Sequence, residues 1–375
     1  MAKEDGRLRQ LADLVTGYSL ATAPGDKLLV VSESPFQDFV RHISDSASER
    51  GARLIYDIYD IEARKRMIER GDKKELKAEG KRTCDLLENA GKVVVVDSES
   101  KPHIMEGVDD EKMAAYEKYV QGPFVNMLDA PVKGTTEKRP NVLVAVPCEA
   151  EARKAGMSLG EYTDFLYNAC LIDWTKTSEK MRRVKARFDN AKDVRVYVPN
   201  QTDLHLSLQG RGGEVCDGKE NLPDGEVCYG PVENSLEGVF YSPYPTVRNG
   251  KEVSGIRLTF RKGKVVEARA DKNQRFLEEM IGLRGGNRVG ELGIGCNPGI
   301  TRYMKSLLFD EKIGGTVHVA MGYSYPQPLD NGGGLNESDI HWDFVCDLRP
   351  INGLPGGELY IDNQLVQKNG VWRFE

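Results

Sequence analysis

The feature that most constrains this fold is a change in hydrophobic pattern near the middle of the chain. In the first half, short unbroken aliphatic runs such as Lys27–Ser32 and Lys92–Asp97 alternate with stretches of helical spacing. Unbroken apolar runs between helices are typical of parallel strands that helices cover on both faces. Residues 1–185 are therefore predicted to form an α/β domain with a mainly parallel sheet.

Beyond this point apolar and polar residues alternate, as in Val194–Val198 and Gly255–Phe260. A period of two residues predicts half-buried, largely antiparallel strands. Further strands are expected at Val289–Ile294, Gly315–Met321 and Ile340–Val345, and helices at Phe276–Leu283 and Ile300–Phe309. Because a chain of 375 residues usually forms more than one domain, residues 186–375 are predicted to be a second, β-rich α+β domain.

Composition excludes several classes of protein. The net charge of −6 argues against binding to nucleic-acid phosphates, which normally takes a surplus of basic residues. The N-terminal segment has no apolar signal core, and runs such as Val93–Val96 are too short to cross a membrane. The 7 cysteines lie far apart without a CxxC pair, which indicates reduced thiols. We expect a soluble cytoplasmic protein with no nucleic-acid or membrane partner.

The strongest local motif is His341-Trp-Asp343, because a strand directs residues i and i+2 to the same face. His318 lies in another predicted strand, and the chain has only 5 histidines. Glu226 and Glu291 stand in apolar or glycine-rich surroundings, where an unpaired carboxylate is costly to desolvate. These residues are candidates for one shared site.

Together, three carboxylates and two imidazoles form a ligand set suited to two divalent ions such as zinc, cobalt or manganese. Two ions about 3.5 to 4 Å apart lower the pKa of a shared water and polarise a peptide carbonyl, so amide hydrolysis is the expected reaction. Structural explanations stand beside this one. A histidine in a strand is often a hydrogen-bonded core residue, Glu226 fits an exposed turn, and Glu291 fits an ion pair with Arg288.

The blocks that contain these residues resemble the M29, or thermophilic aminopeptidase T, family of metallopeptidases. Weaker similarity at Tyr18–Ser19, Pro24–Asp26 and Thr202–Leu204 extends the resemblance over nearly the whole chain. Four ordered blocks are more specific than any single motif. They are Asn221–Val227, Gly290–Gly295, Leu307–Gly322 and Asn336–Asp343.

The resemblance implies a set of site residues. Glu291 is implied as a bridging ligand or as the general base beside the metal-bound water, and Asp343 is the other candidate bridge. Tyr325 is implied as a weak ligand or as a stabiliser of the tetrahedral intermediate, with Tyr323 as the alternative. The implied metal ligands are Glu226, Glu291, His318, His341, Asp343 and, weakly, Tyr325.

The family also implies an activity, which is removal of N-terminal residues from short peptides with a free N-terminus. It implies a homodimer with an enclosed chamber, for which the first domain supplies a wall and dimer contacts. The alternative is a non-haem iron ring-cleaving dioxygenase on a related fold, with His318, His341 and Asp343 as a facial triad. A catalytically silent relative would be expected to have lost ligands, and this chain has lost none.

Overall fold

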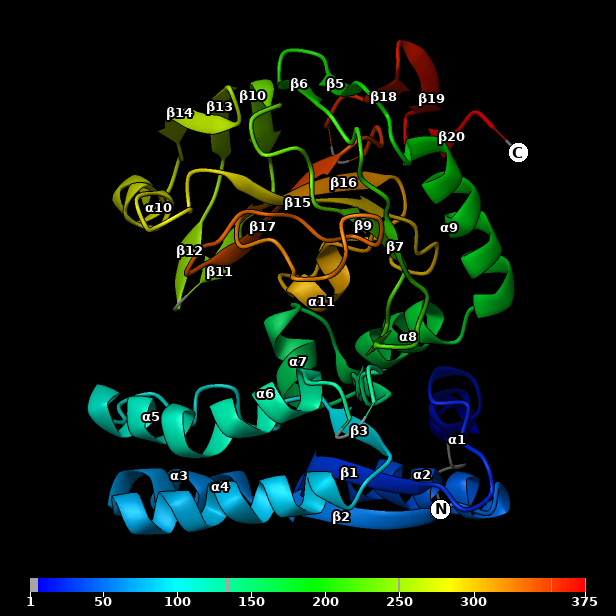
Figure 1. The fold of residues 1–375 in the computed structure, drawn as a ribbon, viewed down its shortest axis with the longest axis vertical. Helices are drawn as coiled ribbons and strands as arrows, with labels where there is room; N and C mark the ends of the chain where they lie inside the picture. The colour runs from blue at the N-terminus through cyan, green and yellow to red at the C-terminus, as the bar shows by residue number, and fades with distance from the viewer. Residues whose placement is uncertain (1–5, 133–134, 249, 352, 375) are drawn as a thin grey trace. The chain divides into compact units, whose positions relative to one another are not determined.

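The computed structural model describes residues 6–132, 135–248, 250–351 and 353–374 (Figure 1). Residues 1–5, part of the segment expected to lack a signal core, lie outside these ranges. The chain forms two compact units. The first comprises the described residues up to Leu171 together with Gly218–Pro223, and the second comprises Ile172–Asp217 and the described residues from Asp224 onward. In the described ranges, no helix has both the length and the apolar character needed to cross a membrane.

The first unit is built on a parallel sheet, as predicted, with strand order β2-β1-β3-β4-β8. Its strands are β1 (Lys27–Glu33), β2 (Arg53–Tyr59), β3 (Lys92–Val96), β4 (Asn141–Val144) and β8 (Asn221–Leu222). The aliphatic runs are buried because helices pack on the sheet, and Leu29 and Val93 contact Leu87 and Leu128 in one cluster. The predicted α/β class of this domain is confirmed.

The helices of the first unit begin where the sequence supplies capping groups. Ser158 and Glu161 form the capping box expected from their spacing, and Asp72 and Glu75 form another. Short 3₁₀ and π turns lie at Ser34–Phe36, Val15–Ser19 and Glu117–Gln121. The helices are α1 (Gly6–Leu14), α2 (Gln37–Glu49), α3 (Ile61–Arg70), α4 (Lys73–Glu88), α5 (Asp110–Tyr116), α6 (Gly122–Asp129), α7 (Glu149–Lys154) and α8 (Leu159–Cys170).

The second unit contains two antiparallel sheets and a small hairpin, which confirms the β-rich prediction. The larger sheet has the order β14-β13-β10-β6-β5-β18-β19-β20 and the smaller one β17-β16-β15-β9-β7. The larger comprises β5 (Val194–Val198), β6 (Thr202–Leu206), β10 (Glu237–Ser242), β13 (Ile256–Arg261), β14 (Lys264–Arg269), β18 (Glu358–Ile361), β19 (Gln364–Lys368) and β20 (Val371–Trp372). The smaller comprises β7 (Glu214–Cys216), β9 (Glu226–Tyr229), β15 (Val289–Gly295), β16 (Thr316–Gly322) and β17 (His341–Asp347), and the hairpin is β11 (Thr246–Arg248) with β12 (Lys251–Val253).

The helices of the second unit differ from the sequence expectations in two places. Helix α9 (Trp174–Phe188) lies mostly ahead of the predicted boundary at residue 185, yet its apolar face packs in the core of the second unit. The helix expected at Ile300–Phe309 is only α11 (Leu307–Asp310), and Lys305 ahead of it has a left-handed φ of 60°, which is not a helical conformation. Helix α10 (Gln274–Ile281) matches its predicted region.

The smaller sheet has two chemically different faces. Alternate residues such as Leu292, Val319 and Phe344 point into the hydrophobic core that this sheet shares with the larger one. The residues between them, which include His318, lie on the opposite face, since side chains alternate along a strand. Antiparallel pairing thus brings the polar residues of four neighbouring strands onto one surface.

Candidate metal centre

Four strands of the smaller sheet place the predicted ligands together. Glu226 lies on β9, Glu291 on β15, His318 on β16, and His341 and Asp343 on β17. The Nε2 atom of His318 lies 3.4 Å from Glu226 Oε2, 3.2 Å from Glu291 Oε1 and 3.9 Å from Asp343 Oδ1. His341 Nε2 is 3.6 Å from Asp343 Oδ1. The five residues therefore form one cluster.

This cluster has buried polar atoms that the described residues do not satisfy. Oε2 of Glu226, Oδ1 of Asp343 and Nδ1 of His318 are buried and have no hydrogen-bond partner. Burying such atoms costs free energy unless an ion or another polar group interacts with them. Two overlapping groups of residues offer ligand atoms, and within each group these atoms lie within 4.8 Å of one another. One group is Glu226, Glu291 and His318, and the other is Glu291, His341 and Asp343.

The donor set fits two divalent transition-metal ions. Imidazole nitrogen and carboxylate oxygen together favour zinc, cobalt or manganese over calcium. Glu291 belongs to both groups of ligand atoms, as a carboxylate shared by two ions would. The arrangement of the residues is thus consistent with a dinuclear site.

The charges within the cluster shift the pKa values of its members. Burial alone would lower the pKa of His318, but its hydrogen bond to Glu291 and the charge of Glu226 raise that pKa to about 10. Burial raises the pKa of Glu226 to about 8, although the ammonium of Lys312 opposes this change. The pKa of Glu291 is lowered, because the hydrogen bond from His318 and the charge of His341 outweigh its burial. Glu291 is therefore the carboxylate that most readily stays ionised.

The structure places Tyr325 and Tyr323 differently relative to His341. The rings of Tyr325 and His341 have centroids 4.8 Å apart. Tyr323 instead contributes its backbone carbonyl, which accepts a hydrogen bond of 2.8 Å from His341 Nδ1 and so leaves Nε2 on the side of Asp343. Although Tyr325 is 43% exposed, desolvation and the charges of Glu291 and Asp343 raise the pKa of its phenol. Tyr325 is thus the tyrosine whose ring lies against His341.

Two residues of the centre were missed from the sequence. Lys312 is only 1% exposed, with Nζ 3.6 Å from Glu226 Oε1 and in an ion pair with Oε1 of Glu311. A carboxylate oxygen of Glu311 lies within 4.8 Å of ligand atoms of His318 and Asp343. Both residues lie inside the Leu307–Gly322 block, where a charged Asp-Glu-Lys run before two glycines was the available signal.

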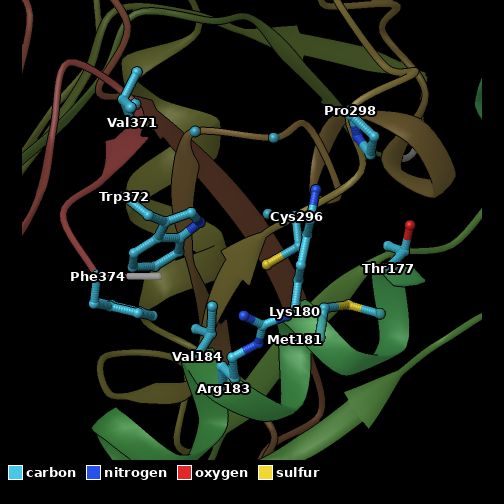
Figure 2. A pocket seen from close by; sticks show the side chains of 14 residues that line it. Thr177, Lys180, Met181, Arg183, Val184, Cys296, Pro298, Val371, Trp372 and Phe374 are labelled. Atoms are coloured by element: carbon cyan, nitrogen blue, oxygen red, sulfur yellow. The ribbon is translucent and has the colours of Figure 1, made fainter. Parts of the chain in front are cut away.

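A separate cavity of about 570 Å³ lies elsewhere in the second unit (Figure 2). Lys180 and Arg183 of α9 line it together with Trp372 and Phe374 near the C-terminus. Its lining has neither a carboxylate nor an imidazole side chain. The chemistry of the side chains therefore favours the cluster on the smaller sheet over this cavity as the reactive site.

Sequence comparisons identify the family of the chain. Residues 4–372 match the family described as thermophilic metalloprotease (M29). The chain is 26% identical to Aminopeptidase T of Thermus thermophilus, covering 90% of this chain and 91% of that protein. It is 23% identical to Aminopeptidase 2 of Geobacillus stearothermophilus, with 100% of both chains covered.

Two solved structures share the fold. Wild-type AmpT from Thermus thermophilus aligns with a TM-score of 0.79 at 22% identity, over 98% of this chain and 99% of that one. A 2,5-dihydroxypyridine dioxygenase from Pseudomonas putida KT2440 aligns with a TM-score of 0.59 at 13% identity, over 98% and 97%. At these identities the two likenesses concern the fold alone.

Proposed function

The chain belongs to the thermophilic metalloprotease (M29) family, and we propose that it removes N-terminal residues from short peptides at the cluster on the smaller sheet. Family membership and the names of its relatives make it a metallo-aminopeptidase, a hydrolase of peptide bonds. The observation that carries the proposed site is the pair of overlapping ligand groups that share Glu291.

Five residues would hold two divalent ions in this proposal. When bound, the ions would lower the pKa of water and polarise the peptide carbonyl. The backbone carbonyl of Tyr323 fixes the His341 ring through Nδ1, which keeps Nε2 available for ligation. The proposed ligands are Glu226, Glu291, His318, His341 and Asp343.

Two residues would handle protons during the reaction. Glu291, whose pKa is lowered, would be ionised, and it would either bridge the two ions or act as the general base that accepts a proton from the attacking water and returns it to the leaving amine. Tyr325 keeps its proton because its pKa is raised, so its hydroxyl can donate to the oxygen that becomes negative. Glu291 lies on strand β15, and Tyr325 lies in the loop that follows strand β16.

The dioxygenase alternative needs one iron held by two imidazoles and one carboxylate. The additional buried carboxylates of Glu226 and Glu291, both beside His318, favour a site for two ions and a hydrolytic reaction. We also propose, from the family resemblance, that the protein is a cytoplasmic homodimer whose chamber limits substrates to short peptides.

The direct test is a dipeptide screen with protein that has been stripped by a chelator and reloaded with zinc, cobalt or manganese. Release of the N-terminal residue from free dipeptides, but not from their N-acetylated forms, is expected. A protein that carries two ions and releases no residue from any dipeptide would refute the proposed function.

A further inference from the structure

The cavity of about 570 Å³ in the second unit is separate from the metal centre (Figure 2). None of its lining residues belongs to a group of candidate metal ligands in the described part of the chain. Its volume falls within the range of about 300 to 1,000 Å³ that is usual for small-molecule sites. The cavity is therefore a candidate binding site in its own right.

The apolar wall of this cavity is held in place by ring contacts. Trp372 and Phe374 line the cavity, and their ring centroids lie 5.1 Å apart. The ring of Phe188 meets that of Trp372 edge-on, with centroids 6.3 Å apart. The guanidinium of Arg187 lies 5.2 Å from the centroid of the Phe374 ring. Because both rings are held by neighbours, a flat apolar ligand would meet a surface that is already formed.

Two cations of α9 line the same cavity. Lys180 and Arg183 are exposed and lie three residues apart, so they are neighbours on one side of the helix. Figure 2 shows Lys180 extending from α9 toward Cys296. Within the described ranges, no carboxylate forms an ion pair with Lys180 or Arg183. The cavity thus combines an aromatic wall with two positive charges that an anion can neutralise.

We propose that this cavity binds a small anion with a flat apolar body, such as an aromatic carboxylate. The apolar body would lie against Trp372 and Phe374, and the anionic group would accept hydrogen bonds from Lys180 and Arg183. A cationic ligand is disfavoured, because the lining has two positive side chains and no carboxylate. This inference does not depend on the proposed peptidase activity.

The test compares 2-naphthoate with 2-naphthamide, which has nearly the same shape but no charge. Both compounds are titrated by calorimetry into chelator-treated protein, so that no contact between a carboxylate and a metal contributes. The wild type should bind 2-naphthoate at least about 10-fold more tightly than 2-naphthamide, because charge-assisted hydrogen bonds are gained. Added salt should weaken the binding of 2-naphthoate but not of 2-naphthamide, since the two cations are exposed.

Substitutions locate the bound anion. The double variant Lys180→Met with Arg183→Met removes both charges and retains good helix formers. It should bind 2-naphthoate about 10-fold more weakly, and 2-naphthamide within about twofold of the wild type. Lys176→Met is the matched control and should bind both compounds as the wild type does, because Lys176 lies on the same helix, pairs with Asp173 and does not line the cavity. Trp372→Leu should weaken both compounds alike.

Four results would overturn the inference. They are equal affinity of the wild type for the two compounds, binding of neither, a preference for 2-naphthoate that persists in the double variant, and binding of 2-naphthoate by metal-loaded protein alone. The last would assign the compound to the metal centre. If the double variant folds poorly, the comparison of compounds and its salt dependence in the wild type still decide. Failure of the aminopeptidase proposal would leave these binding measurements unchanged.

Discussion

The imidazole of His318 lies directly over Gly293, its partner in the pairing of β15 with β16. A Cβ atom added at Gly293 would lie 1.9 Å from Cε1 and 2.0 Å from Nε2 of His318. No other residue type leaves room for the ring in this position. The glycine thus allows the imidazole to reach Glu226 and Glu291 across the neighbouring strands.

Gly293→Ala should therefore damage the metal centre directly. The methyl group must displace the His318 ring, so metal affinity is expected to fall by at least about 10-fold, as for other changes that misorient a ligand. A chelator competition assay measures this affinity. Gly160→Ala in α8 is the matched control, because a Cβ there meets nothing within 4 Å. Unchanged metal affinity in Gly293→Ala would contradict the placement of His318.

Glu291→Gln should abolish turnover while the fold remains intact. The amide has the shape of the carboxylate but cannot accept and return a proton, so kcat is expected to fall by about 10²-fold to 10⁴-fold. Steady-state kinetics on a dipeptide would measure the loss, and circular dichroism would verify the fold. A Glu291→Gln enzyme with wild-type kcat would rule out the proposed proton transfer.

Metal affinity should increase with pH. In chelator-treated protein His318, with a pKa of about 10, and Glu226, with a pKa of about 8, both hold protons at neutral pH. A metal binds the neutral imidazole and the ionised carboxylate, so it must displace these protons. Kd should then fall about tenfold per pH unit for each displaced proton between about pH 6.5 and 8. A pH-independent Kd would show that these groups do not ligate the ion.

Removal of metal should lower thermal stability. The cluster of Glu226, Glu291 and Asp343 is buried in the folded protein, so ions bound there stabilise the folded state relative to the unfolded chain, which lacks the site. Ions present at 100 times their Kd would add about 2.7 kcal/mol to the free energy of unfolding. Calorimetry with and without a chelator measures the change in Tm. In His341→Ala the chelator should have a smaller effect, and an equal effect would exclude His341 as a ligand.

Much of the fold could be predicted because local patterns agree with the tertiary structure. The unbroken aliphatic run of Val93 and Val94 became a buried parallel strand, and the Ser158 capping box began a helix. The helix expected at 300–309 failed because loop contacts override its apolar spacing. Asp310 accepts hydrogen bonds from the backbone of Met304 and Ser306, and this holds a turn in place of the first helical residues.

The clustering of the candidate site residues could be predicted where a sequence motif specified it, but not where only tertiary packing brings residues together. His341 and Asp343 share a strand, so their spacing alone predicts a common face. Lys312 and Glu311 belong to the centre because the turn after α11 carries them to β9 and β16, a long-range contact that no local pattern encodes. That the ring of Tyr325 lies against His341 is likewise a long-range contact that the sequence did not reveal.

The most direct test of the dinuclear centre is the metal content of reconstituted protein, measured by elemental analysis per chain. The two ligand groups that share Glu291 predict two divalent ions per wild-type chain. His341→Ala should retain about one ion, because the group of Glu226, Glu291 and His318 stays complete. A single ion in the wild type, with Glu226 substitutions leaving that ion bound, would contradict the account.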